Sequence, residues 1–165
     1  MNIFYLDENP QLCAQYHCDK HVVKMILETA QLLSTAIHLS TEQDFADIYN
    51  PTFPNHPCNK WARKTLANFE WLQKLGLHLC SEYTYRYNKT HKSQDIIEKV
   101  WLYRDFIPSG LFTVRPQCMP DIYKDDTSVI NAYRNYYLGA KTHILKYTRR
   151  PVPYWIANMS LGENK

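Results

Sequence analysis

The sequence predicts a mainly α-helical protein that forms a single compact domain, residues 1–165, of about four helices joined by long proline-containing loops. Three observations lead to this class. The chain has 165 residues, of which 45% are hydrophobic, and a chain of this size can bury a core of its own. Aromatic residues make up 14% of it and only 4 residues are glycine, a composition typical of long helices rather than of a turn-rich β fold. The longest segments also repeat their apolar residues at about 3.6 residues per turn.

The first helix is predicted to run from Pro10 to about Ser40. Asn9 can cap the free backbone N–H groups at its start, and Pro10 fits the first helical position because no N–H donor is needed there. The apolar residues that follow share one broad arc of the helix, and they are Leu12, Tyr16, Val23, Ile26, Leu27, Ala30, Leu33 and Ile37.

The remaining elements follow from the prolines and from the apolar spacing. Proline disfavours a helical conformation at the residue before it, so Pro51, Pro54 and Pro57 predict a loop over residues 41–57. Pro57 can then open a second helix that extends to about Asn88. The later segments are predicted to be a helix over residues 93–106, an irregular stretch with Pro108, Gly110, Pro116 and Pro120, a helix over residues 127–147, and an extended tail over residues 149–155.

Several classes of protein are disfavoured by features that the sequence lacks. No apolar run approaches the roughly 20 residues that cross a bilayer, and the first residues form no basic and apolar leader, so we expect a cytoplasmic protein without a membrane segment. The cysteines number 5, with no Cys-x-x-Cys pair, which argues against a disulfide framework and against a zinc ribbon. Glycine-rich phosphate loops and a nucleophile elbow are missing as well, and we expect no cofactor.

One stripe of the first helix collects groups that transfer protons. His17, His21, Lys24, Glu28 and Gln31 are spaced by four, three, four and three residues, which places them within about 80° of arc. Such a stripe is either the solvated face of an amphipathic helix or a reaction surface. Solvated faces usually alternate Lys and Glu, whereas two histidines one turn apart titrate near neutral pH.

Two neighbours of this stripe are further catalytic candidates. Asp19 falls inside the apolar arc, so it either pairs with a Lys or Arg of another helix, caps a backbone end, or acts as a catalytic acid with a raised pKa. Lys20 lies at the edge of the stripe and is either a surface lysine or a nucleophile that forms a Schiff base.

A metal site is another interpretation of the two helical histidines. His17 and His21 can direct two imidazoles at one point, but Cys18 follows His17 where a zinc protease has Glu, and no third ligand is close in sequence. A third ligand would have to come from His56, His78 or His91. We therefore predict no metal ion at this stripe.

Two segments, residues 83–92 and residues 146–155, interleave basic and aromatic side chains. Cations neutralise phosphates and flat rings stack on exposed bases, so the combination indicates binding to opened or distorted nucleic acid. In the alternative interpretation, the tyrosines belong to the core and the charges only keep the protein in solution. The candidate nucleic-acid-binding residues are Arg86, Lys89, His91, Lys92, Lys146, Arg149, Arg150, Tyr154 and Trp155.

Several blocks of the chain together resemble a family of small, mostly uncharacterised phage and bacterial proteins. These blocks are Asp7 and Pro10, residues 17–28, Asn55-His56-Pro57, Asn68-Phe69-Glu70-Trp71-Leu72 and Tyr133-Arg134-Asn135-Tyr136-Tyr137. This resemblance covers nearly the whole chain and implies no function.

A second resemblance is to the pyrimidine-dimer DNA glycosylases of the phage endonuclease V type. These are small all-α repair enzymes that cut the glycosidic bond of a damaged base and then nick the backbone. The shared features are the chain length, Gln15-Tyr16-His17 followed by a helical carboxylate, the aromatic run at residues 68–72, and the basic, aromatic carboxyl end. The resemblance implies that a first-helix carboxylate, Glu28 or otherwise Asp19, orients or protonates the departing sugar, and that basic side chains grip a kinked duplex.

The resemblance also implies an amine that forms a Schiff base with the sugar. In that family it is the N-terminal amine, freed by loss of the first methionine. Here Asn2 follows Met1, and a side chain of that size normally blocks methionine removal. The amine would then belong to Met1, Lys20 or Lys24, or the lyase step would be missing.

The first functional hypothesis is therefore a DNA base-excision or base-processing enzyme, a glycosylase with or without a lyase step. It would bind distorted or modified duplex DNA and act on a damaged or modified pyrimidine. Its catalytic candidates are Glu28, Asp19, His17, His21, Lys24 and Lys20. The alternatives are a non-catalytic phage-type nucleic-acid- or protein-binding module and a metal-dependent hydrolase.

Overall fold

The computed structural model describes residues 1–162, so the last three residues of the expected domain, 163–165, lie outside it. Over the described residues the fold is all-helical without a strand, which confirms the predicted class, but it has seven α-helices rather than about four. The helices are α1 (Pro10–Tyr16), α2 (Asp19–His38), α3 (Pro57–Lys64), α4 (Leu66–Tyr87), α5 (Gln94–Lys99), α6 (Val129–Ala140) and α7 (Tyr154–Gly162). Three 3-10 helices, η1 (Val100–Phe106), η2 (Asp121–Tyr123) and η3 (Thr142–Ile144), complete the description.

The predicted first helix is interrupted, because α1 ends before His17 and α2 starts after Cys18. Asn9 caps α1 as predicted, accepting hydrogen bonds from the backbone N–H groups of the next turn. His17 and Cys18 are both extended, with ψ values of 131° and 160°. The guanidinium of Arg86 donates to the carbonyl oxygens of Gln15 (3.0 Å) and His17 (2.8 Å), which satisfies the free end of α1. A side chain that lies 69 residues from His17 in the sequence therefore stabilises this break.

The predicted second helix is likewise interrupted, at Thr65. Thr65 is extended, with φ −143° and ψ 153°, and its hydroxyl caps α4 by accepting from the N–H of Asn68. The N–H of Leu66 donates to the carbonyl of Pro108 at 2.7 Å. This bond takes the place of the one that Leu66 would donate within a continuous helix.

The other predicted elements differ at their ends. No helix occurs over residues 41–56, which confirms the proline-containing loop. The third predicted helix changes from α5 to η1 at Val100, and the fourth ends at Ala140. The tail is not extended throughout, because α7 begins at Tyr154 and the carbonyl of Pro153 accepts from the N–H groups of its first turn.

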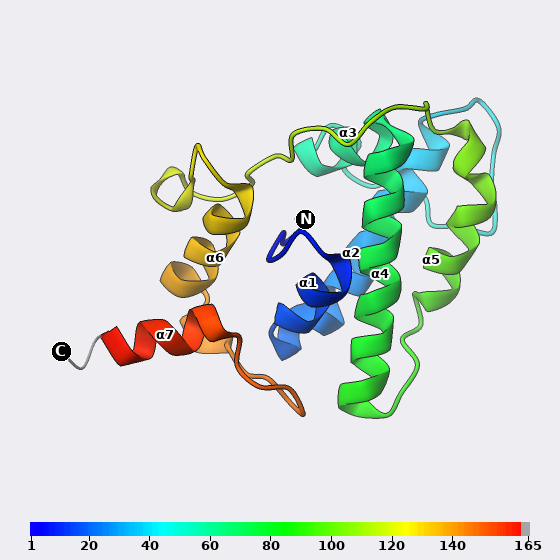
Figure 1. The fold of residues 1–165 in the computed structure, drawn as a ribbon. Coiled ribbons are helices and arrows are strands. Elements are labelled where there is room, and N and C mark those ends of the chain that lie inside the picture. The colour runs from blue at the N-terminus through cyan, green and yellow to red at the C-terminus, as the bar shows by residue number, and fades with distance from the viewer. Residues whose placement is uncertain (163–165) are drawn as a thin grey trace.

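The amino-terminal segment runs through the middle of the molecule. Figure 1 shows this segment in dark blue between α6 on one side and α2 and α4 on the other. Its residues Ile3, Phe4, Tyr5 and Leu6 are all buried. Around them α2 packs on α4, and α1 packs on α4 as well. The start of the chain is therefore fixed inside the helical framework instead of lying on its surface.

Two tyrosines of α6 hold this segment in place. Tyr133 and Tyr137 are fully buried. The hydroxyl of Tyr133 donates to Oδ1 of Asn2 at 2.9 Å, and the ring of Tyr137 packs against Phe4 with 5.5 Å between centroids. Asn2 also donates from its amide to the carbonyl of Cys118 at 2.8 Å. These contacts fix the first two residues relative to α2, which positions the site described next.

Candidate active site

A pocket of about 290 Å³ lies between α2 and α6 and contains the amino end of the chain; we call it the amine pocket. Three residues of the predicted stripe, His21, Lys24 and Glu28, form its α2 wall. Its other polar groups come from distant parts of the chain and are those of Met1, Asn2, His56, Cys118, Tyr136 and Lys141.

Glu28 is the buried acid of the amine pocket, with only 7% of the residue exposed. The α-ammonium nitrogen of Met1 lies 3.3 Å from Oε1 of Glu28, and the backbone N–H of Asn2 donates to the same oxygen at 3.1 Å. The second carboxylate oxygen, Oε2, has no hydrogen-bond partner among the described residues. Its nearest cation is Nζ of Lys24, at 3.8 Å. A buried carboxylate oxygen without a partner is costly in a folded protein, so this oxygen is available to a bound molecule.

The amine pocket carries more positive than negative groups. Its cations are the Met1 ammonium, Lys24 and Lys141, and the carboxylate of Glu28 is its acidic side chain. The ammonium of Lys141 also lies 4.9 Å from the centroid of the Tyr136 ring. Such a pocket attracts anions, including the phosphates that flank a nucleotide.

His21 lines the amine pocket with an uncharged imidazole. Its Nδ1 lies 2.7 Å from the hydroxyl of Tyr137, and its ring packs against Phe4 with 4.3 Å between centroids. Burial, followed by the positive charges of His17, Lys141 and Lys24, lowers the pKa of His21 to about 3. The imidazole is therefore uncharged at neutral pH and offers a hydrogen bond instead of a charge.

His17 is fully buried and does not line the amine pocket. Its Nδ1 lies 2.7 Å from the carbonyl of Cys13, so this nitrogen carries the proton, and Nε2 has no partner among the described residues. Burial lowers the pKa of His17 to about 4. The break between α1 and α2 removes His17 from the stripe, so the structure gives it a place in the core and not in the pocket.

Asp19 is buried, as its position in the apolar arc predicts, but it lies in an ion-pair network and not in the amine pocket. Its Oδ1 lies 3.1 Å from Nη1 of Arg86, and the hydroxyl of Thr148 donates to its Oδ2 at 2.6 Å. Arg86 also pairs with Glu82, which pairs in turn with Arg150. These contacts match the ion-pair interpretation of Asp19 and place it away from the candidate chemistry, so Glu28 is the only helical carboxylate in the pocket.

The two candidate lysines differ in position. Lys20 is exposed and does not line the amine pocket. Lys24 lines it, although 69% of its side chain is exposed. The amine that lies closest to Glu28 is therefore the α-amine of Met1.

Several of the predicted nucleic-acid-binding residues require correction. The side chain of Arg86 is fully buried and bonded to Asp19 and Glu82, so it cannot reach a phosphate. Trp155 is 8% exposed and packs against Tyr137, so its ring has no free face for a base. Both ring nitrogens of His91 bond to the backbone, one to Val23 and one to Ser93. Arg150 remains partly exposed at 28% of its side chain but is engaged with Glu82. The predicted residues that are exposed are Lys89, Lys92, Lys146, Arg149 and Tyr154.

The exposed lysines of this set lie close to the exposed side of α2. His91, in the turn that carries Lys89 and Lys92, bonds to the carbonyl of Val23 at 3.1 Å. The carbonyl of Lys146 accepts from the N–H of Asp19 at the start of α2. Lys20 and Lys24 are exposed on α2 itself. We call these five exposed lysines, which lie on α2 or beside it, the basic face: Lys20, Lys24, Lys89, Lys92 and Lys146.

The two helical histidines do not meet a third metal ligand. Among the described residues, the group of three side chains that could hold an ion is His56, Cys58 and Cys118, which includes neither His17 nor His21. The stripe therefore offers no geometry that supports a metal-dependent hydrolase.

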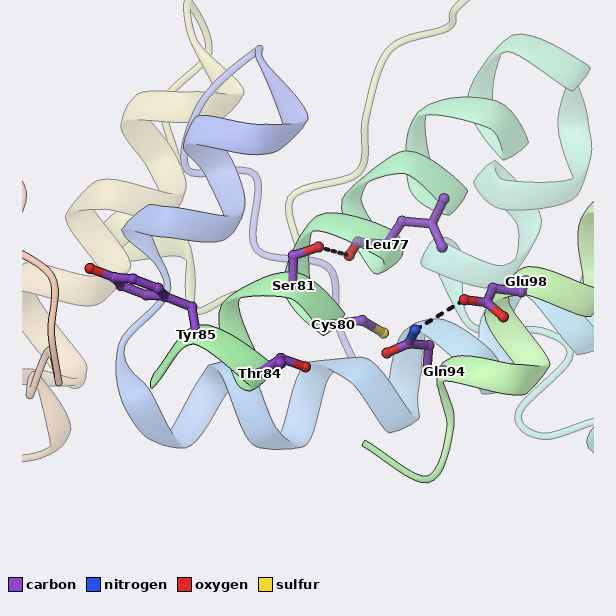
Figure 2. Close-up of a pocket in the computed structure, with 7 residues that line it drawn as sticks. All are labelled: Leu77, Cys80, Ser81, Thr84, Tyr85, Gln94 and Glu98. Carbon is purple, nitrogen blue, oxygen red and sulfur yellow. Dashed lines mark hydrogen bonds between the residues drawn. The ribbon is translucent and has the colours of Figure 1, made fainter. Parts of the chain in front are cut away.

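A second cavity, of about 450 Å³, lies between α4 and α5. Figure 2 shows its lining, in which Ser81 donates to the carbonyl of Leu77 and the amide of Gln94 donates to Glu98. Burial raises the pKa of Cys80 to about 12, so its thiol is not a nucleophile at neutral pH. Ser81, Gln94 and Glu98 of this larger cavity are thus already hydrogen-bonded, in contrast to the carboxylate oxygen Oε2 in the amine pocket.

Comparison with protein-family models gives a match over residues 1–95 to the family described as pyrimidine dimer DNA glycosylase. The chain belongs to this family. The matched residues include Met1 and Glu28 and end within α5. Among the curated proteins and the solved structures, neither search finds a significant match. The resemblance to the glycosylases seen in the sequence is thus confirmed.

Five polar residues of the amine pocket are missed by sequence reasoning as catalytic candidates: Asn2, His56, Cys118, Tyr136 and Lys141. None shares a helix with the stripe, so no periodicity connects them to it. Two sequence signals single out His56: its block with Pro57 carries a family resemblance, and it is one of the histidines considered as a third metal ligand. No described helix is both long enough and apolar enough to cross a membrane.

Proposed function

We propose that the protein is a DNA glycosylase that removes a damaged or modified pyrimidine, with the α-amine of Met1 as nucleophile and Glu28 as proton acceptor and donor. The observation that carries this proposal is the distance of 3.3 Å between the Met1 nitrogen and Oε1 of Glu28 inside a positively charged pocket. The family match adds the substrate class, DNA with a damaged pyrimidine.

The chemistry begins with loss of a proton from the ammonium, which Glu28 is placed to accept. The free amine then attacks C1′ of the damaged nucleotide. The bond from C1′ to the base breaks, the base leaves with the electron pair and takes up a proton, and the sugar ring opens to give a Schiff base between C1′ and the amine. Oε2 of Glu28, which accepts no hydrogen bond from the described residues, can deliver a proton to the departing groups.

A lyase step can follow from the same Schiff base. Removal of the C2′ proton by a base releases the 3′ phosphate with the electron pair of its C–O bond, which nicks the strand. Water then hydrolyses the Schiff base and restores the amine. Each of these steps requires one amine and one carboxylate within contact distance, and Met1 and Glu28 provide them.

The arrangement does not depend on whether the first methionine is retained. The backbone nitrogens of Met1 and Asn2 both lie within 3.3 Å of Oε1 of Glu28, at 3.3 Å and 3.1 Å. Removal of Met1 would leave the amine of Asn2 at the same oxygen. Lys24 is the competing amine, but it is exposed and lies at 3.8 Å from the other oxygen.

The basic face gives the DNA a place to bind. Its five lysines lie on and beside the exposed side of α2, the helix that supplies Glu28 to the amine pocket. A duplex held there by its phosphates has to present the damaged nucleotide out of the base stack, because a base within the duplex cannot reach a buried carboxylate.

Trapping with borohydride tests the proposal. Duplexes that contain a pyrimidine dimer, an abasic site or a modified pyrimidine are incubated with the protein and sodium borohydride, which reduces a Schiff base to a stable covalent bond. We expect a trapped complex with the wild-type protein. In Glu28→Gln we expect a rate at least about 100-fold lower, because a general acid or base contributes that much, while binding persists.

The control removes a carboxylate of the same kind on the surface. Glu70 pairs with Lys74 and is 43% exposed on its side chain, so Glu70→Gln should trap and cleave like the wild type. Normal cleavage by Glu28→Gln would overturn the assignment of Glu28. Binding without any trapping or base release in the wild type would favour the non-catalytic binding module.

An extension of the chain tests the amine separately. Two residues added before Met1 turn its amine into an amide, which cannot form a Schiff base, so trapping should be lost while the overall helix content is kept. Lys24→Ala should still trap. If the extended protein traps and Lys24→Ala does not, the nucleophile is Lys24 and the assignment of Met1 is wrong.

A further inference from the structure

Three soft metal ligands meet at the wall of the amine pocket and are not used by the proposed chemistry. His56 is the N-cap residue of α3, Cys58 lies in its first turn, and Cys118 comes from the irregular segment before η2. The Sγ atoms of Cys58 and Cys118 are 3.7 Å apart. A ring nitrogen of His56 and these two sulfurs all lie within 4.8 Å of one another.

The distance between the two sulfurs is that of a tetrahedral zinc site. With zinc–sulfur bonds of about 2.3 Å and a tetrahedral angle, two thiolate ligands lie about 3.8 Å apart. The observed 3.7 Å between the sulfurs needs almost no rearrangement to accept an ion. We propose that His56, Cys58 and Cys118 bind a thiophilic divalent cation of the zinc class, with the fourth position left for water or a bound ligand.

Geometry distinguishes this pair of thiols from the other cysteines. Among the described residues, Cys13, Cys18 and Cys80 belong to no group of three metal-ligating side chains that lie within 4.8 Å of one another.

The ring of His56 can join the two sulfurs at a small cost. Its Nδ1 accepts one hydrogen bond, from the N–H of Cys58 at 3.1 Å, which caps α3. Ligation through Nδ1 would exchange this single bond for a metal bond. Ligand atoms from α3 and from the segment at residue 118 would then be joined directly, across 60 residues of chain.

The ion would form part of the wall of the amine pocket. His56 and Cys118 both line this pocket, and Asn2, which holds the start of the chain, donates to the carbonyl of Cys118. An ion bound here would therefore fix the elements around the start of the chain. This inference stands on the ligand geometry alone and does not depend on the proposed glycosylase activity.

The test uses Co²⁺ as a spectroscopic substitute for Zn²⁺. The full-length protein is stripped of metal with a chelator, kept reduced, and titrated with Co²⁺. We expect one equivalent to produce a sulfur-to-cobalt charge-transfer band together with the visible bands of tetrahedral cobalt, and one equivalent of Zn²⁺ to abolish both. Cys58→Ser, Cys118→Ser and His56→Ala should each weaken binding at least about 10-fold to 100-fold.

Two control variants make the outcome decisive. Cys80→Ser removes a buried thiol elsewhere and should bind Co²⁺ like the wild type, provided that its circular dichroism shows the native helix content. Glu28→Gln should also bind normally while it loses cleavage, which separates failure of this inference from failure of the proposed function. Cys118 is less buried than Cys58, so Cys118→Ser gives a readout even if Cys58→Ser does not fold.

Two results would overturn the inference. One is the absence of a charge-transfer band at one equivalent of Co²⁺ in the reduced protein. The other is unchanged binding in both Cys118→Ser and His56→Ala, which would assign the ion to different ligands.

Discussion

At the scale of single residues, the structure separates groups that look alike in the sequence. Glu28 and Asp19 are both buried acids of α2, with 7% exposure each. Asp19 receives an arginine and a hydroxyl, whereas Oε2 of Glu28 receives no hydrogen bond among the described residues. Loss of a partner from the paired carboxylate would be destabilising, whereas the partly open carboxylate is the one that can accept a hydrogen bond from a ligand.

The neutral state of His21 predicts how stability depends on pH. Its pKa is about 3 in the folded protein against 6.5 for the free side chain, so the unfolded chain binds the proton more strongly between these values. The free energy of unfolding should therefore fall as the pH drops below about 6.5, by about 2 kcal/mol between pH 6.5 and pH 5 from this group. Urea unfolding of the wild type and of His21→Gln at both pH values measures the difference.

In His21→Gln this part of the pH dependence should disappear, although the variant is less stable at pH 7. Restricting the comparison to pH 5 and above keeps most carboxylates ionised in both proteins. An identical loss of stability in the two proteins over this range would show that His21 is not the titrating group.

Phe53 gives a second prediction at this scale. Within residues 1–162 it is one of three residues other than glycine with a positive φ, here 46°, and it is 67% exposed. A left-handed conformation costs roughly 1 kcal/mol for a residue with a Cβ and little for glycine. Phe53→Gly should therefore be more stable than Phe53→Ala in urea unfolding, by up to about 1 kcal/mol, because both lack the ring and relief of the strain outweighs the larger backbone entropy that glycine loses on folding. Equal stabilities would mean that the loop relaxes around residue 53.

At the scale of elements, the helices follow from the sequence but their ends do not. The apolar spacing and the caps at Asn9 and Pro57 predict helices where helices occur. The breaks at His17 and Thr65 are stabilised by partners far away in the chain, the guanidinium of Arg86 and the carbonyl of Pro108. Local propensity carries no information about such partners, and so two long helices were expected in place of four shorter ones.

Contacts between residues far apart in the chain also limit how much of the site can be predicted from the sequence. The stripe places His21, Lys24 and Glu28 together because one helix fixes their spacing. Met1, His56 and Lys141 reach the pocket only through packing of the amino-terminal segment, α3 and α6, which no spacing in the sequence encodes. The carboxylate can thus be proposed from the sequence, while the fold is needed to choose among the amines of Met1, Lys20 and Lys24.

Arg86 connects α1, α2 and α4, and its replacement should lower the free energy of unfolding. Its guanidinium bonds to the carbonyls of Gln15 and His17 and pairs with Asp19 and Glu82. Arg86→Met would leave buried acceptors and a buried carboxylate without this partner, and removal of one member of a buried ion pair costs about 3 to 5 kcal/mol. Urea unfolding should show a loss of this size.

A matched control for Arg86→Met is Arg63→Met. Arg63 makes one exposed hydrogen bond, to the carbonyl of Pro54 at 2.8 Å, and its loss should change the free energy of unfolding by less than about 1 kcal/mol. If Arg86→Met changed the free energy of unfolding only slightly, water or Arg150 would be able to replace the guanidinium of Arg86 between α1, α2 and α4.

At the scale of the whole molecule, the net charge of +3 is small, and the distribution of the charge decides where DNA binds. The buried arginine of the expected set is neutralised within the core, while the lysines of the basic face remain exposed. Binding to duplex DNA should accordingly depend on few phosphate contacts, so its affinity should fall as salt is added with a slope set by those few contacts.

The salt dependence can be assigned to single lysines. The logarithm of the binding constant falls with the logarithm of the salt concentration by about 0.9 for each phosphate contact. The double variant Lys89→Ala and Lys92→Ala should lower this slope by up to about 1.8 in fluorescence anisotropy titrations with a duplex. Lys74→Ala, which removes a lysine already paired with Glu70, should leave the slope unchanged. An unchanged slope in the double variant would place the DNA on another surface.

The hydrogen bonds of Asn2 have a consequence for how the protein is made. Asn2 bonds to Cys118 and to Tyr133, which lie 116 and 131 residues further along the chain. During synthesis the amino-terminal segment leaves the ribosome long before those partners do. The amine pocket therefore cannot close on a nascent chain, and a ribosome that stalls before α6 releases a protein in which Asn2 lacks both of these bonds.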